Sequence, residues 1–348
     1  MMILRILSGL LGVVIVGGTL ISAIKTFILP RGINVWLTAV IFRTISFFFR
    51  ISVKRATYER RDRVMALFAP VTLFFMPMVF LLFVLIGYMF IFWAINQQSL
   101  YDIFKLSGSS LLTLGYASVE TPLSKIVEFS EAMIGLILVA LLIAYLPSIY
   151  ASFSSRETNV ALLEGFAGSP PSAVELLARS YRTAQLNNLS ELWQSWIRWF
   201  AELEESHTSF FPLAFFRSPM PERSWVTSAG VILDAASLRL AAIDGPQDLR
   251  AAFCIRIGFL ALRQIADFFN FPYDANPAST DPISISQDEF NIAYDELLER
   301  GIPMKPDREQ AWRDFAGWRV NYDSVLLALA SFTMAPYAMW VSDRSAIK

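Results

Sequence analysis

The chain has few charged residues and almost no side chains that bind metals or form disulfides. Only 17% of its 348 residues are charged, whereas a soluble globular domain has about 25%. Cys254 is the only cysteine, which excludes an intrachain disulfide. His207 is the only histidine, so a typical zinc cluster or a Cys–His catalytic pair lacks ligands unless distant residues converge. We expect Cys254 to be packed in a core and His207 to lie at the surface, with no metal site.

Short motifs of phosphate chemistry and acyl transfer are also missing. The sequence contains no glycine-rich phosphate loop and no nucleophile elbow. Its second half shows no alternation of strand-like and helix-like segments, which excludes a nucleotide-binding domain of the Rossmann type. Because clustered acids, bases and metal ligands are absent as well, a membrane enzyme is the weakest hypothesis. We expect no enzyme activity and no nucleic-acid partner.

The charge that is present divides the chain into two parts. Residues 1–155 hold 12 Lys or Arg against 6 Asp or Glu, a balance of +6. Residues 156–348 hold 17 against 24, a balance of −7, and the two balances give the net charge of −1. We therefore expect a basic membrane portion followed by an acidic portion that faces water.

Three apolar runs reach the roughly 20 residues that a bilayer-spanning helix needs. Nineteen uncharged residues separate Arg5 from Lys25, and residues 64–101 and 132–155 carry no charge. As one helix, residues 64–101 would reach about 57 Å, nearly twice the hydrocarbon thickness. We therefore expect a span over residues 67–94, followed by a different structure. A cleaved signal peptide is the alternative for the first run.

The segment between the first two runs is strongly basic. Residues 31–63 contain eight Lys or Arg, opposed by Glu59 and Asp62. Positive residues near spans stay cytoplasmic, so we expect the N-terminus outside and the C-terminus in the cytoplasm. Aromatic residues with interspersed arginines over residues 35–55 favour a helix that lies on the cytoplasmic leaflet, with its arginines at lipid headgroups. The alternative is a connector folded onto the protein.

Residues 96–131 are external at both ends in this topology, yet they are apolar in the middle. A re-entrant segment explains this pattern, because non-helical backbone at membrane depth is tolerated only where it is buried or lines water. Within the segment, residues 109–116 read Ser-Ser-Leu-Leu-Thr-Leu-Gly-Tyr. The residues from Thr113 to Tyr116 resemble the first four of the T-V-G-Y-G filter of potassium channels, where backbone carbonyls replace the hydration shell of the ion.

The resemblance extends beyond these four residues. Residues 67–152, about a quarter of the chain, look like the outer helix, pore helix, filter and inner helix of a potassium channel. The run from Tyr145 to Pro171 resembles bacterial channel-like proteins of the two-pore-domain potassium channel type. Only one filter motif occurs per chain, which implies a homotetramer around one ion path.

The resemblance implies an all-α membrane protein: a potassium-channel-like pore domain with an extra N-terminal span and a helical cytoplasmic C-terminal domain. It places the protein in the cell membrane, the bacterial inner membrane, as a multi-pass protein surrounded by membrane lipids. The expected divisions are an N-terminal transmembrane helix (1–30), a basic linker helix (31–63), the pore domain (64–155) and the cytoplasmic domain (156–348).

The resemblance also assigns roles within the pore. Residues 99–112 would form the pore helix, Thr113 would supply the innermost ion site, and Leu114, Gly115 and Tyr116 the middle carbonyls. Potassium ions in this filter are the only bound species implied, and no cofactor is expected. In the family a glycine follows the tyrosine, whereas this chain has Ala117.

The alanine at position 117 weakens the inference of potassium selectivity. The family's glycine adopts a backbone conformation that costs other residues about 1 kcal/mol or more. Ala117 therefore either bears that strain or opens the outer filter. A cation channel, with potassium as the expected ion, is the leading hypothesis. A non-conducting, channel-derived membrane receptor or scaffold is the alternative.

Two residues of the third span are candidate gating hinges. Proline inside a helix removes a backbone hydrogen bond, so Pro147 is one candidate, and Gly135 is the other. Close helix packing at Gly135 and a span end at Pro147 are the alternatives. Glu120 and Glu131 are the candidates for a carboxylate ring at the outer mouth, with ordinary solvated charges as the alternative.

Residues 156–348 show helical patterns. Ser172 with Glu175 and Ser286 with Glu289 match capping boxes, and the first predicts a helix to about residue 186. Apolar residues from Leu189 to Leu203 repeat at helical spacing, and further helices are predicted over 226–243 and 248–270. The uncharged run 324–342 favours a buried helix, with a fourth span as the alternative. The sequence neither indicates nor excludes an unidentified ligand of this domain.

Overall fold

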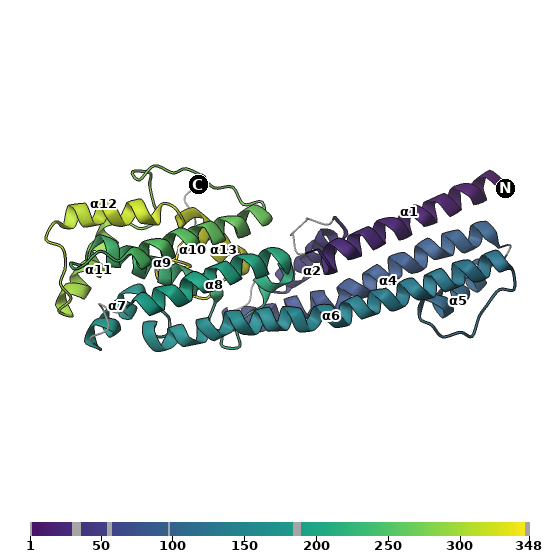
Figure 1. Cartoon of the computed structure of the whole chain (residues 1–348), viewed down its shortest axis with the longest axis horizontal. Helices are drawn as coiled ribbons and strands as arrows, with labels where there is room; N and C mark the ends of the chain where they lie inside the picture. The colour runs from purple at the N-terminus through teal and green to yellow at the C-terminus, as the bar shows by residue number, and fades with distance from the viewer. Residues whose placement is uncertain (1, 30–35, 54–57, 97, 184–188, 345–348) are drawn as a thin grey trace. The chain divides into compact units, whose positions relative to one another are not determined.

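The protein is all-helical. The computed structural model describes residues 2–29, 36–53, 58–96, 98–183 and 189–344. Within these ranges no strand forms, and the one isolated bridge pairs Ile243 with Met304. The chain divides into two compact units, Met1–Ala151 and Ser152–Lys348 (Figure 1). The predicted all-α class is confirmed, while the basic residues Arg31, Lys54 and Arg55 lie outside the described ranges.

Unit 1 contains the candidate membrane helices. Its elements are α1 (Met2–Phe27), α2 (Trp36–Val53), α3 (Tyr58–Ala66), α4 (Phe68–Ile95), α5 (Leu100–Leu111) and the larger part of α6 (Pro122–Ala167). Among the residues that the structure describes, four stretches are long and apolar enough to cross a membrane: α1, α2, the stretch Arg60–Ile95, and α6. Three of them contain the predicted spans. The fourth, α2, was expected to lie at the membrane surface. These helices support the prediction of a membrane protein.

Small residues let α1 pack tightly along α4. A methyl group on Gly12 would lie 2.5 Å from the carbonyl oxygen of Gly87, so neither backbone leaves room for a larger residue. One turn earlier, the Ser8 hydroxyl donates a hydrogen bond of 3.0 Å to the carbonyl of Phe90. Small residues and interhelical hydrogen bonds of this kind are what hold helices together in lipid.

Helix α6 is longer than the predicted third span. It runs from Pro122 to Ala167 without a break, and Pro147 lies in its interior. The helix therefore does not end at Pro147, and the alternative of a span end there stays a prediction. The hinge hypothesis for Pro147 stays a prediction, because proline inside a helix leaves one carbonyl without its backbone partner.

Unit 2 is a bundle of shorter helices. After the end of α6 it contains α7 (Ala173–Arg182), α8 (Ser190–Ser209), the 3₁₀ turn η2 (Phe211–Phe215), α9 (Trp225–Ala241), α10 (Leu249–Phe268), α11 (Gln287–Glu299), α12 (Arg308–Arg319) and α13 (Asp323–Thr333). Nearly every residue of α9 is buried, and α7, α10, α12 and α13 pack against it (Figure 1). Helix α9 is thus the centre of this unit, as an apolar run without a polar face predicts.

The two matching cap motifs have different outcomes. Ser286 and Glu289 form the reciprocal capping box that begins α11. Ser172 makes no side-chain cap, and α7 ends at Arg182, earlier than predicted. The carboxylate of Glu175 instead binds the guanidinium groups of Arg179, at 2.5 Å, and Arg300, at 2.6 Å. Residues 184–186 of the predicted helix lie outside the described ranges.

The run 324–342 is a buried helix followed by irregular chain. Helix α13 has 11 residues and ends at Met334, which adopts a left-handed conformation with φ 52°. Eleven residues rise about 16 Å, roughly half the hydrocarbon thickness, so the fourth-span alternative is wrong. Val325, Leu326 and Leu329 are buried in the core of unit 2.

The lone cysteine is buried as predicted, whereas the prediction for the lone histidine is wrong. Burial raises the pKa of the Cys254 thiol. His207 lies on the inner face of α8, one turn after Leu203, whose carbonyl is 3.0 Å from its Nδ1 atom. Burial and the nearby guanidinium of Arg156 lower the pKa of His207 well below its usual range. The neutral ring contacts Trp225 in a tilted arrangement, with 4.7 Å between ring centroids.

Candidate functional site: the pore segment

The pore segment consists of α5 and the turn that follows it. Helix α5 begins where the sequence predicts, because the Ser99 hydroxyl accepts a hydrogen bond of 3.2 Å from the backbone N–H of Asp102. This contact satisfies one of the amides that a helix start leaves unpaired. The helix ends at Leu111, immediately before the motif from Thr113 to Tyr116. The predicted short helix over 99–112 is confirmed as an element.

Two residues of the motif adopt left-handed backbone conformations. Gly115 has φ 71°, which glycine adopts without steric cost. Thr113 has φ 54°, which is a genuine outlier for a β-branched residue. Ala117 does not adopt a positive φ. The structure therefore has no left-handed strain at Ala117, which was the first of the two alternatives for this residue.

Ser109 in α5 holds the turn through two of its atoms. Its carbonyl oxygen accepts a hydrogen bond of 2.8 Å from the backbone N–H of Leu114 and a longer one of 3.4 Å from that of Gly115. Its hydroxyl oxygen accepts from the backbone N–H of Ala117 at 3.1 Å. The N–H of Thr113 also donates, to the Ser110 carbonyl at 2.9 Å, so four amides of residues 113–117 are directed at α5. The side chains of Leu114 and Tyr116 are 60% and 66% exposed.

Helix α6 packs on α5 with one polar face. The Ser107 hydroxyl donates a hydrogen bond of 2.5 Å to Glu131, and the Ser110 hydroxyl donates one of 2.6 Å to the carbonyl oxygen of Glu128. A methyl group on Gly135 would lie 2.2 Å from the carbonyl oxygen of Leu111, so this position admits only glycine. The close-packing alternative for Gly135 therefore describes the structure, and its hinge role stays a prediction.

Glu131 does not line an outer mouth. Its side chain is fully buried between α5 and α6, which contradicts the predicted carboxylate ring at this residue, whereas Glu120 is exposed. The spacing of Glu128, Glu131 and Gly135 explains the error, because positions three and four apart share the helix face that packs on α5. The Oε2 atom of Glu131 has no hydrogen-bond partner within the described residues. Buried polar atoms of this kind are rare and occur at functional sites.

Polar contacts also join α4 to α6 beside the pore segment. The Ser124 hydroxyl at the start of α6 donates a hydrogen bond of 2.9 Å to the Asn96 side chain at the end of α4. Farther along, the hydroxyls of Tyr88 and Ser130 are 2.9 Å apart. Sequence reasoning missed these residues and the three serines of α5. The sequence feature that could have identified them is a set of hydroxyl-bearing residues within an otherwise apolar run.

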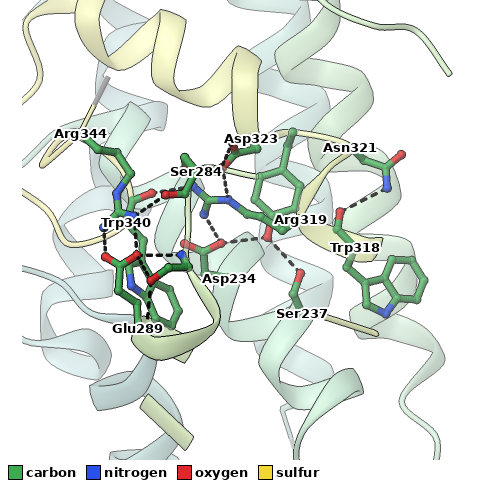
Figure 2. A network of polar contacts seen from close by, with 12 residues as sticks. Asp234, Ser237, Ser284, Glu289, Trp318, Arg319, Asn321, Asp323, Trp340 and Arg344 are labelled. Atoms are coloured by element: carbon green, nitrogen blue, oxygen red, sulfur yellow. Dashed lines mark hydrogen bonds and ion pairs between the residues drawn. The ribbon is translucent and has the colours of Figure 1, made fainter. Parts of the chain in front are cut away.

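Unit 2 contains a second polar cluster, which Figure 2 shows. Arg319 is completely buried and donates to Asp234, to Asp323 at 2.7 Å and to the Trp340 carbonyl at 2.5 Å. Burial lowers the pKa of Arg319, but the two carboxylates outweigh this and raise it. Asp323 also accepts hydrogen bonds from the backbone N–H and the hydroxyl of Ser284. Because its charges are paired within the unit, we assign this cluster to packing.

Neither region, as far as the structure describes it, has the arrangement of a metal centre. Within the described ranges, no group of three or more His, Cys, Asp and Glu side chains is placed to hold a metal ion. The pore segment instead offers backbone carbonyls and hydroxyls, which are ligands for hard cations. No protein-family model matches the chain, and no curated protein or solved structure shows significant similarity to it.

Proposed function

We propose that the chain is one subunit of a homotetrameric cation channel of the potassium-channel type, which conducts through residues 113–117. The observation that carries this proposal is the anchoring of the motif to Ser109, with Thr113 held in a left-handed conformation. Strained backbone persists only where its surroundings fix it, and it clusters at functional sites. With amides of the turn directed at α5, its carbonyls are the groups that remain for an ion.

The position of α5 supports a cation as the conducted species. The C-terminal end of this helix, at Leu111, lies immediately before Thr113. Unpaired carbonyls give a helix C-terminus a partial negative charge that stabilises cations within about one turn. No basic side chain follows until Lys125. This end of α5 therefore favours a dehydrated cation at the start of the motif.

Exposed apolar side chains support assembly from several copies. Leu112, Leu114 and Tyr116 are exposed next to the motif. Helix α6 leaves a second exposed stripe at Ile126, Phe129, Met133 and Leu136, roughly opposite the face that packs on α5. Contiguous apolar surface marks an interaction site or a lipid contact. Closed cyclic symmetry with four copies would bring four motifs to one axis.

The alternative is a non-conducting membrane receptor or scaffold with the same pore segment. Ala117 favours it, because this residue does not adopt the left-handed conformation expected of the filter's second glycine. A filter that loses an ordered carbonyl at that point has fewer sites for the ion. Binding of a partner to unit 2 without any flux would support this alternative. If the pore conducts, we propose that it is gated by the helices of unit 2 and by the hinge candidates Gly135 and Pro147.

Ion flux tests the proposal directly. We expect proteoliposomes with the wild-type chain to pass potassium, whereas Gly115→Val should be silent because valine is strained at φ 71°. Gly18→Val is the matched control, since a side chain on Gly18 of α1 meets no atom within 4 Å. Both variants should cross-link as tetramers. Unchanged flux in Gly115→Val would remove residues 113–117 from the ion path.

The same assay tests selectivity. Ala117→Gly should raise the ratio of potassium to sodium flux, because glycine restores access to the left-handed conformation. Equal ratios in the two proteins would show that position 117 does not set selectivity. If a cross-linked wild-type tetramer passes neither ion, the receptor alternative is favoured.

A further inference from the structure

Helix α2 packs against the last turn of α1 and the first residue of α4. Its Thr38 hydroxyl lies 2.9 Å from that of Thr26, in the last turn of α1. Phe42 and Phe49, about 10 Å apart along the axis of α2, both contact Phe68 at ring-centroid distances of 4.9 and 5.4 Å. Phe68 is the first residue of α4. Phe68 thus lies between two rings of α2, which fixes this helix to the start of α4.

The outward face of α2 combines large apolar side chains with arginines. Trp36 is 74% exposed, and Phe47 and Phe48 are exposed as well. Arg43 and Arg50 are exposed on the same face, because the spacing of 36, 43, 47 and 50 follows the helical repeat. Arg50 contacts the hydroxyl of Ser46, and neither arginine forms an ion pair within the described part of the chain. The face thus has unpaired positive charge between aromatic rings.

We infer that the outward face of α2 (Trp36, Arg43, Phe47 and Arg50) binds anionic phospholipids of the cytoplasmic leaflet. Aromatic rings at this depth enter the boundary between headgroups and acyl chains, while guanidinium groups reach the phosphates. Exposed Arg60 and Arg63 of the adjacent α3 add charge of the same sign. An anionic lipid satisfies both the charge and the apolar surface, which a soluble anion does not.

The inference goes beyond the proposed channel function and does not depend on it. It requires that α1 and α4 lie in a membrane with their α2 end on the cytoplasmic side. Where the pore conducts, the lipid would act at the start of α4, because Phe42 and Phe49 join the lipid-binding helix to Phe68. The test below therefore measures contact with lipid and not ion flux.

Fluorescence quenching of Trp36 tests the inference with the full chain. The protein is reconstituted in phosphatidylcholine vesicles that carry a fixed fraction of brominated phosphatidylglycerol or brominated phosphatidylcholine. The Trp36 signal is the difference between wild type and Trp36→Phe, since bromine quenches an indole that it contacts. We expect stronger quenching by the brominated phosphatidylglycerol, with each arginine adding about fivefold to the preference for the anionic lipid.

Arginine variants identify the source of that preference. Arg43→Gln/Arg50→Gln should keep the Trp36 quenching but lower the preference for the anionic lipid about 25-fold. Arg198→Gln/Arg256→Gln, which removes two exposed arginines of unit 2, should leave the preference unchanged. Absence of quenching by either lipid would mean that α2 is covered by protein or water. Equal quenching in the wild type would mean that α2 has no headgroup preference, as for a spanning helix. Either result overturns the inference.

Discussion

At the scale of single residues, polar side chains decide the local geometry of both units. Ser109 holds the pore motif through its carbonyl and its hydroxyl, so one residue sets the positions of three amides. In unit 2, Glu289 both caps α11 and binds the guanidinium of Arg344 at 2.7 Å. Each of these residues contacts more than one partner, and each can be tested by one substitution.

Acid should weaken the contact between Glu289 and Arg344. Hydrogen bonding to Arg344 lowers the pKa of Glu289 from 4.5 to about 2 in the folded chain. A carboxyl with a depressed folded pKa stabilises the fold above its unfolded pKa, and this stabilisation is lost as the pH falls from about 4.5 through about 2. Thermal unfolding of unit 2 in this pH window should therefore depend less on pH in Glu289→Gln than in wild type. Parallel curves for the two proteins would contradict the assignment.

At the scale of elements, the contact between α5 and α6 positions the motif. Three residues of one α6 face, Glu128, Glu131 and Gly135, meet the C-terminal half of α5. The contact leaves no space at Gly135, because its Cα approaches the backbone of Leu111. Since the motif begins two residues after Leu111, a displacement of this contact is transmitted directly to Thr113.

Gly135→Ala should therefore displace the end of α5. The added methyl group would lie 2.2 Å from a backbone oxygen, which cannot move as a flexible side chain would. We expect loss of ion flux and a lower unfolding temperature, by the cost of about 1–3 kcal/mol typical of overpacking. Gly165→Ala in the same helix is the matched control, because a methyl group there meets no atom within 4 Å. Equal flux in both variants would show that this packing does not matter for conduction.

At the scale of the whole molecule, the two units have separate cores of different chemistry. Unit 1 exposes large apolar side chains along α1, α4 and α6, which suits contact with lipid. Unit 2 buries its apolar residues around α9 and pairs Arg319 with two carboxylates inside that core. We therefore expect a change in the core of unit 2 to leave the helices of unit 1 folded.

Arg319→Met provides that test. It leaves Asp234 and Asp323 buried without their cation, which costs about 3–5 kcal/mol in proteins with such pairs. Hydrogen exchange of the full chain in detergent should increase across α9 and α12 while exchange in α1 and α4 stays at the wild-type rate. Arg313→Met, an exposed arginine of the same helix, is the control. Increased exchange in both units would show that their stabilities are linked.

The sequence predicted the elements of the pore segment better than the contacts between them. Uncharged length predicted α1 and α4, and the resemblance to a potassium-channel pore predicted α5. Glu131 and His207 were wrongly expected at a surface, because a polar side chain is usually solvated. Their burial depends on partners from other elements, Ser107 in one case and Arg156 in the other. No local pattern encodes such partners.

The two capping motifs illustrate the same limit at a helix start. Ser172 and Ser286 have the same spacing to a following glutamate, yet only Ser286 forms the box. Glu175 has Arg179 one turn later and Arg300 from another helix as stronger partners. The left-handed conformations of Thr113 and Gly115 were likewise beyond local reasoning, which could assign a glycine but not a strained threonine.

The polar cluster of unit 2 has a consequence for the order of events during synthesis. Asp234 precedes Arg319 by 85 residues, and the Trp340 carbonyl that completes the cluster comes 21 residues later. At ribosomal speeds of 5–20 residues per second, Asp234 waits roughly 4–17 s for its cation. Val341, which packs against Gly230 of α9, emerges later still. The helices of unit 1 therefore leave the ribosome while the core of unit 2 is still incomplete. During this interval a chaperone can bind the unfinished unit 2.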